Sequence, residues 1–283
     1  MLEPAPSGVI TLLSDFGLSD PFVGVMTGVL LSRFPGARVV DLCHGIRPQA
    51  IAEGAFWLER CYHWFPPGTV HVAVVDPGVG SSRGVLAATI AGHYFLLPDN
   101  GLLGPALLAA PGARVLAVDV PQLGLATPSA TFHGRDVFAP LAAGLASGGL
   151  RFATLGVPTR PQPSLLPLPR RSATGASGEV VCVDRFGNLL TNLDEAFLQQ
   201  ELTRGTAASR VRVAGQSLRW LRTYAEAQPG ELLALVNAFG VLEIAARDDS
   251  AERRLGVSRG AAVELEAAPL QTVELVAPGA PRA

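Results

Sequence analysis

Four polar clusters in the sequence could carry chemistry, and each of them directly follows a short apolar run. They are residues 14–17 (SDFG), 41–44 (DLCH), 76–84 (DPGVGSSRG) and 98–101 (PDNG). In open parallel sheets, ligands bind at the carboxyl ends of the strands. Aspartates at such positions could accept hydrogen bonds from a sugar diol. Aspartates also cap helices and pin turns, so both interpretations stay open for each of them.

The cluster 76–84 offers the most specific chemistry. Asp76 and Arg83 lie on one loop, and His133 precedes a Gly-Arg-Asp turn elsewhere in the chain. An arginine can orient and polarise a bound group, and a histidine can move a proton. The alternatives are a structural ion pair and an ordinary loop histidine. Gly78 and Gly80 let a backbone approach a ligand, although their spacing is not that of a dinucleotide-binding fingerprint.

A second dense stretch lies in the later part of the chain, at 183–192 (VDRFGNLLTN). Phe186 could stack on an aromatic ligand, and Asp184 and Asn188 could bond to its polar groups. A strand–turn–strand held by Asx turns explains the same residues equally well. The segment 237–245 (NAFGVLEIA) predicts a further turn and strand that could close a pocket.

Several other chemistries are excluded by what the sequence lacks. It contains no lysine, which excludes a P-loop lysine, a Schiff base and a pyridoxal-phosphate anchor. The five histidines show neither the H-E-x-x-H spacing nor paired Cys/His spacing, so we expect no metal site. There is also no G-x-S-x-G motif, so no hydrolase nucleophile elbow is expected.

The composition narrows the class of protein further. The chain has 283 residues, a formal net charge of −2, 48% hydrophobic and 16% charged residues. This near-neutral balance predicts no binding to nucleic acid, and no apolar run reaches the length of a membrane span. Three cysteines (Cys43, Cys61 and Cys182) and the absence of a signal peptide predict a reducing, cytoplasmic location.

Strand and helix patterns alternate through the first half of the chain. Such alternation predicts an α/β fold with a largely parallel sheet. The segments 85–90 and 94–97 flank Ala-Gly-His and predict a hairpin. We expect further strands over 9–13, 38–42, 69–75 and 114–118, and helices over 22–34, 51–64 and 137–146.

The pattern changes after residue 160. Closely spaced prolines and a run of small residues predict a linker over 161–178, between an α/β domain at 1–160 and a second domain at 179–283. Short apolar runs separated by turns make the second domain smaller and mainly β. Its expected elements are strands over 179–183, 210–213, 231–236, 241–245 and 262–265, and one helix over 194–202.

Seven motifs together identify a family that the chain resembles. They are, in order, SDFGLSDPFVGVMTG, DLCHGI, VVDPGVGSSRG, PDNG, FHGRDVFAPLAAGLA, VDRFGNLLTNL and NAFGVLEIA. From about Val9 to Ala245, the chain resembles the S-adenosyl-L-methionine hydroxide adenosyltransferases. These adenosine-forming S-adenosylmethionine (SAM) hydrolases are relatives of the fluorinase and the chlorinase.

The resemblance implies a fold, an assembly and a reaction. It implies an N-terminal α/β domain and a C-terminal β-barrel-like domain. It also implies a homotrimer that holds the adenosyl ligand between the N-terminal domain of one subunit and the C-terminal domain of its neighbour. The implied reaction is the hydrolysis of SAM to adenosine and L-methionine, by in-line attack of water or hydroxide on C5′. SAM is then the substrate, and no cofactor is implied.

The resemblance also assigns residues. Asp76, Arg83 and His133 match an Asp–Arg–His set that the halogenases lack, which favours water over halide as the nucleophile. Asp15 matches the ribose-diol aspartate. The remaining substrate-binding positions fall on Asp184, Phe186, Asn188, Asn237, Glu243 and Ala245. Two alternatives stay open: a SAM-dependent halogenase, and a non-catalytic module that binds adenosine or SAM.

Overall fold

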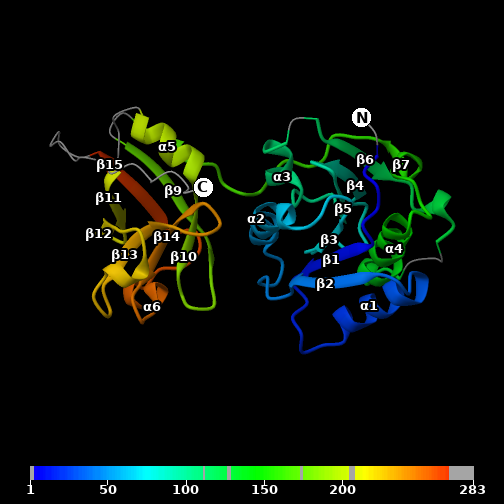
Figure 1. Cartoon of the computed structure of the whole chain (residues 1–283), viewed down its shortest axis with the longest axis horizontal. Helices are drawn as coiled ribbons and strands as arrows, with labels where there is room; N and C mark the ends of the chain where they lie inside the picture. The colour runs from blue at the N-terminus through cyan, green and yellow to red at the C-terminus, as the bar shows by residue number, and fades with distance from the viewer. Residues whose placement is uncertain (1–2, 111, 126–128, 173–174, 204–207, 268–283) are drawn as a thin grey trace, which may run out of the picture. The chain divides into compact units, whose positions relative to one another are not determined.

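The chain forms two compact units that divide between Leu166 and Pro167. The computed structural model describes every residue except 1–2, 111, 126–128, 173–174, 204–207 and 268–283 (Figure 1). The division falls inside the stretch 161–178 that the sequence predicts as a linker. Strand β9 already begins at Gly175, so the end of that stretch belongs to the second unit. The last residues of the predicted second domain, 268–283, lie outside the described residues.

The first unit contains a seven-stranded sheet with the order β2-β1-β3-β5-β4-β6-β7. Strand β1 runs parallel to β2 and β3, and β3 runs parallel to β5. The pairs on the other side of β5 are antiparallel. The strands are Val9–Ser14 (β1), Arg38–Cys43 (β2), Val70–Val74 (β3), Val85–Ile90 (β4), His93–Pro98 (β5), Arg114–Val118 (β6) and Gly156–Pro158 (β7).

This sheet confirms the predicted α/β class, with a mixture of parallel and antiparallel strands. The predicted hairpin accounts for the mixture. Ala91 and Gly92 both have positive φ angles, of 48° and 85°. Two such residues give a tight turn whose twist matches that of the flanking strands. Strand β5 therefore returns beside β4, and only the β2-β1-β3-β5 half of the sheet is parallel.

Helices cover both faces of the sheet. α1 (Phe22–Arg33) packs against α4 (Ala139–Ser147), and α2 (Ile51–Cys61) packs against α3 (Gly104–Leu108). Successive residues of β1 point to opposite faces. Accordingly, Leu12 joins the core under α1 and α4, while Leu13 joins the core under α2 and α3. None of the helices within the described ranges is long and apolar enough to cross a membrane.

The second unit is a closed barrel. Its strands follow the order β10-β14-β13-β12-β11-β15-β9, and the pairing of β9 with β10 closes the ring. The short strand β8 adds to the outside of β9. This confirms the implied barrel-like domain. The strands are Arg170–Arg171 (β8), Gly175–Val183 (β9), Leu189–Asp194 (β10), Ala208–Val213 (β11), Gln216–Trp220 (β12), Leu232–Val236 (β13), Val241–Ala246 (β14) and Ala262–Ala267 (β15), with helices Glu195–Thr203 (α5) and Ala251–Leu255 (α6).

Three buried polar side chains form a hydrogen-bonded chain in the core of the first unit. His71 Nδ1 lies 2.8 Å from Thr11 Oγ1, and His71 Nε2 lies 3.2 Å from His93 Nδ1. All three side chains are buried. Burial, followed by the nearby His93, lowers the pKa of His71 to about 3. The folded protein therefore keeps this ring neutral far below the pH at which a free histidine gains a proton.

This buried ring predicts an acid-sensitive stability. Between pH 6.5 and about 3, the unfolded chain protonates His71 and the folded chain does not. The free energy of unfolding should therefore fall with decreasing pH, by up to ~1.4 kcal/mol per pH unit from this group. Urea titrations at pH 7 and pH 5 should show a smaller pH effect for His71→Phe, which keeps the ring packing. The exposed His63→Gln is the control, and equal pH effects in wild type and His71→Phe would contradict the prediction.

Candidate active site

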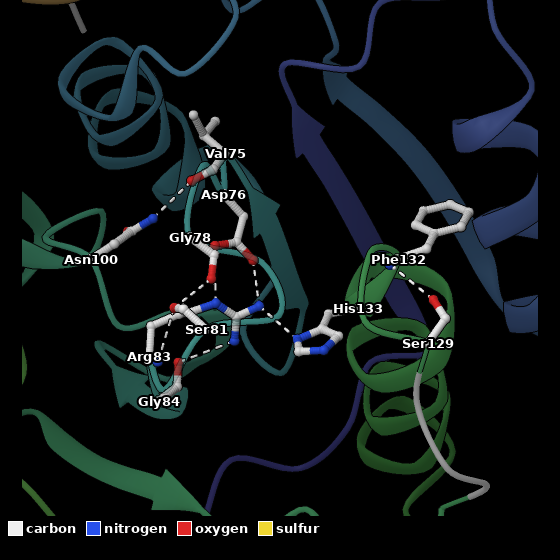
Figure 2. A network of polar contacts seen from close by, with 10 residues as sticks. All are labelled: Val75, Asp76, Gly78, Ser81, Arg83, Gly84, Asn100, Ser129, Phe132 and His133. Atoms are coloured by element: carbon white, nitrogen blue, oxygen red, sulfur yellow. Dashed lines mark hydrogen bonds and ion pairs between the residues drawn. The ribbon is translucent and has the colours of Figure 1, made fainter.

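The loop between β3 and β4 holds a buried carboxylate–guanidinium pair. Arg83 Nε donates to Asp76 Oδ1 at 2.9 Å, and Arg83 Nη2 donates to Asp76 Oδ2 (Figure 2). The side chains of Arg83 and Asp76 are only 9% and 4% exposed. Two parallel N–H···O bonds fix the plane of the guanidinium as well as its position. The pair predicted from the sequence is therefore formed, and it is rigid.

His133 completes the cluster from a distant part of the chain. Arg83 Nη2 lies 2.7 Å from His133 Nδ1 (Figure 2). A guanidinium can only donate, so Nδ1 must be the acceptor and the neutral ring carries its proton on Nε2. Burial, followed by the charge of Arg83, lowers the pKa of His133 below its ordinary value. The ring is therefore held neutral in one tautomer.

Close backbone packing brings the loop to the histidine segment. His133 immediately precedes a π-helical turn, Gly134–Phe138, that leads into α4. Gly80 has a φ of +79°, and a Cβ built on it would lie 2.3 Å from the carbonyl oxygen of Ala130. Asn100 Nδ2 donates to Val75 O at 2.8 Å and holds the other end of the loop. A glycine is thus required where the loop meets the segment before His133.

Asp15 lies at the same edge of the sheet as Asp76. Strands β1 and β3 are parallel neighbours, and Ser14 pairs with Val74, so both aspartates follow the carboxyl ends of adjacent strands. Asp15 Oδ2 accepts a hydrogen bond from Gln49 N at 2.8 Å. The hydrogen bond from Gln49 therefore fixes the loop that contains Asp15. Asp15 Oδ1 has no hydrogen-bond partner within the described part of the chain.

Three phenylalanine rings connect the Asp15 segment with the His133 segment. The ring centroids of Phe16 and Phe22 lie 5.6 Å apart, and those of Phe22 and Phe132 lie 5.4 Å apart. Phe16 and Phe132 also meet, at 6.0 Å. Sequence reasoning missed this contact, although each of the three lies inside one of the seven motifs. The rings bring Asp15 and the Asp76–Arg83–His133 cluster into one neighbourhood.

The predicted ligand residues of the second unit begin with a tight turn between β9 and β10. Asp184 Oδ1 accepts from the backbone N–H groups of Phe186 and Asn188, both at 2.9 Å. Asp184 Oδ2 accepts from Asn188 Nδ2 at 2.9 Å. These are the bonds of an Asx turn. The turn presents the Phe186 ring to solvent, 78% exposed.

A buried carboxyl lies on the strand beside that turn. The register of β10 and β14 places Leu190 opposite Glu243. Glu243 is 3% exposed and accepts from Asn237 Nδ2 at 3.0 Å and from the Tyr224 hydroxyl at 2.7 Å. Burial raises the pKa of Glu243 above its ordinary value. Sequence reasoning missed Tyr224, which belongs to none of the seven motifs.

Ala245 lies two residues further along β14. Its methyl group lies in an apolar cluster with Leu221, Leu233 and Leu235, and its backbone lies opposite Leu233 of β13. The sequence-predicted site residues thus form two groups, one in each unit. Within the described residues, no group of three or more histidines, cysteines, aspartates and glutamates is arranged to hold a metal ion.

These features define a protein of two units. The first is a mixed α/β unit with a polar Asp–Arg–His cluster beyond the carboxyl end of β3, and the second is a closed β-barrel. The chain belongs to the SAM hydroxide adenosyltransferase family. The model of that family's N-terminal domain matches residues 10–156, and the model of its C-terminal domain matches residues 178–264.

Individual relatives agree with this membership. An (R)-S-adenosyl-L-methionine hydrolase from Thermus thermophilus is 40% identical over 263 residues, which cover 90% of this chain and 98% of the relative. A fluorinase from an Actinoplanes species is 27% identical, covering 84% of this chain and 90% of the relative. A crystal structure of an uncharacterized conserved protein from Thermotoga maritima superposes with a TM-score of 0.82. It is 32% identical and covers 90% of this chain and 98% of its own.

The close approach of Gly80 to Ala130 predicts a position-specific loss of stability. Gly80→Ala would add both a Cβ clash and a strained φ, whereas Gly124→Ala would add only the strain, because its Cβ meets no atom of the described residues within 4 Å. We expect Gly80→Ala to lower the free energy of unfolding by about 1–3 kcal/mol more than Gly124→Ala. Denaturant unfolding measures both. Equal losses would mean that the loop does not depend on this contact.

Proposed function

We propose that this protein hydrolyses SAM to adenosine and L-methionine. The observation that carries the proposal is the hydrogen-bonded cluster of Asp76, Arg83 and His133 in a chain of this family. Relatives named (R)-S-adenosyl-L-methionine hydrolase at 31–40% identity support it, since the fluorinases are more distant. The proposal also includes a homotrimer in the cytoplasm, with each adenosyl ligand held between neighbouring subunits.

The reaction needs little from the protein beyond positioning. In SAM, the positively charged sulfur already makes C5′ electrophilic, and methionine leaves as a neutral thioether. An oxygen of water or hydroxide forms the new bond to C5′ while the C5′–S bond breaks. The electron pair of the broken C5′–S bond goes to sulfur. When water attacks, one of its protons passes to solvent water, and when hydroxide attacks, no proton is released. The oxygen must be held about 3–3.5 Å from C5′, opposite the sulfur.

The tautomer that the Arg83 bond assigns to His133 determines which role each of these side chains can play. Arg83 Nη2 donates one of its two N–H groups to Asp76 and the other to His133. His133 then presents Nε2–H, a donor, to anything bound beyond it. A donor beside a guanidinium stabilises an oxygen that carries negative charge, and it does not abstract a proton. We therefore assign His133 to binding the nucleophile, Arg83 to stabilising its charge, and Asp76 to orienting Arg83.

The predicted ligand residues complete the proposal. Asp15 would accept hydrogen bonds from the ribose diol. Phe186 would stack on the adenine from its exposed position on the turn, which the bonds of Asp184 and Asn188 make rigid. Asn237, Glu243 and the main chain of Ala245 would lie beside the adenine.

The reaction itself is tested by following the oxygen. Incubation with SAM in halide-free, ¹⁸O-labelled water should give adenosine with the label on its 5′ oxygen. Arg83→Ala should slow this release by about 10²–10³-fold, because it removes the charge next to the nucleophile. Arg151→Ala, an exposed arginine outside the cluster, is the control. A 5′-halo-5′-deoxyadenosine formed only when chloride or fluoride is added would indicate a halogenase, and tight adenosine binding without turnover would indicate a binding module.

The donor role of His133 predicts a graded pair of variants. His133→Gln places an amide N–H near the position of Nε2, whereas His133→Ala supplies no donor. We expect His133→Ala to lower kcat by about 10²-fold or more, and His133→Gln to recover a measurable part of that loss. Single-turnover assays separate this chemical step from product release. Equal inactivity of the two variants would favour a histidine that acts as a base.

A further inference from the structure

Behind Asp15 lies a second polar cluster that the proposed reaction does not use. Ser14 Oγ lies 2.7 Å from His44 Nδ1, and His44 Nε2 lies 3.2 Å from Asp41 Oδ1. Ser14 and His44 are buried, at 2% and 6% exposure, whereas the side chain of Asp41 is 57% exposed. A buried polar cluster beside a ligand residue calls for a physical explanation.

The cluster does not have the geometry of a hydrolase triad. In such a triad the serine faces His Nε2 and the aspartate faces Nδ1, and the serine is open to substrate. Here the two ring nitrogens are exchanged, and Ser14 is buried. Ser14 Oγ also accepts the backbone N–H of Phe16 at 3.3 Å, so its own proton is available to His44 Nδ1. His44 Nε2 approaches Asp41 Oδ1 to 3.2 Å but makes no hydrogen bond within the described residues, so the bond to Ser14 is the one that holds the ring.

The same segment of chain ties down the Asp15 loop at two more points. Gly17 N donates to the carbonyl oxygen of His44 at 2.9 Å. Gln49 N donates to Asp15 Oδ2 at 2.8 Å, from a residue with a φ of 64°. A non-glycine residue in this left-handed region is strained, and the surrounding structure must hold it there. Bonds on both sides of Asp15 thus set the direction of its carboxylate.

We propose that His44 is a positioning residue for Asp15, acting through its Nδ1 bond to Ser14. This rests on the proposed role of Asp15 as the ribose-diol ligand. His44 fixes Ser14, the neighbour of Asp15 in the chain, and its carbonyl group fixes Gly17 on the other side. Asp15 Oδ1 is then presented to the diol without a search through other rotamers, which lowers the entropy cost of binding.

Two substitutions of His44 separate the contributions of its nitrogens. In His44→Asn, the amide oxygen takes the place of Nδ1 and still accepts from Ser14. In His44→Gln, the amide reaches the place of Nε2, and no acceptor remains for Ser14. Ser14→Ala removes the same bond from the other side, and it serves where a His44 variant does not fold. The exposed His63→Gln is the control.

The readout is the affinity of the full-length protein for adenosine and for 2′,3′-dideoxyadenosine, which lacks the diol. Calorimetry should show that His44→Gln and Ser14→Ala weaken adenosine binding about tenfold, the worth of one hydrogen bond, and leave dideoxyadenosine binding unchanged. His44→Asn should keep most of the adenosine affinity. Loss of affinity for both ligands alike would show a merely structural role, and unchanged adenosine binding would also overturn the proposal.

Asp15→Asn separates this inference from the function on which it rests. If Asp15→Asn keeps the full preference for adenosine over dideoxyadenosine, the ribose assignment is wrong, and the role of His44 falls with it. If Asp15→Asn loses that preference but His44→Gln and Ser14→Ala keep it, only the inference about His44 is overturned.

Discussion

The candidate active site depends on one guanidinium group. Arg83 donates its Nε–H and one Nη2–H to Asp76 and its second Nη2–H to His133. A single planar group therefore joins two loops, since Arg83 and His133 are 50 residues apart in sequence. The group cannot lose its charge, and both partners are held at hydrogen-bond distance. Burial, followed by the charge of Arg83, lowers the pKa of His133, and the donor on Nδ1 then determines which tautomer the neutral ring adopts.

The fold supplies this arrangement through strand order and close backbone packing. The parallel neighbours β1 and β3 have their carboxyl ends on the same side of the sheet, which places Asp15 and Asp76 in neighbouring loops. The histidine arrives from the turn before α4, where Gly80 packs against the carbonyl of Ala130. Local sequence thus determines each loop, but the contact between the loops is determined by the packing of α4 on the sheet.

This division explains how much could be predicted from the sequence. The α/β class, the hairpin and most strands follow from apolar periodicity and turn residues. Strand β12 is not predicted, because only Leu218 of its five residues is buried and the alternation is too weak to detect. Composition alone does not show that the small residues from Gly175 onward pair with β15, because such residues are typical of loops.

Side-chain partners were less predictable than side-chain types. Asp76, Arg83 and His133 could be singled out, but neither spacing nor composition shows which ring nitrogen meets the arginine. That detail changes the chemistry: a sulfonium substrate needs no acid for its leaving group, and a donor on His133 supplies no base. In the proposed reaction, the side chains would then act by holding an oxygen and stabilising its charge. Tyr224 and His44 could not be singled out from the sequence for the same reason. Each is of interest only because of the buried side chain that it contacts, Glu243 for Tyr224 and Ser14 for His44.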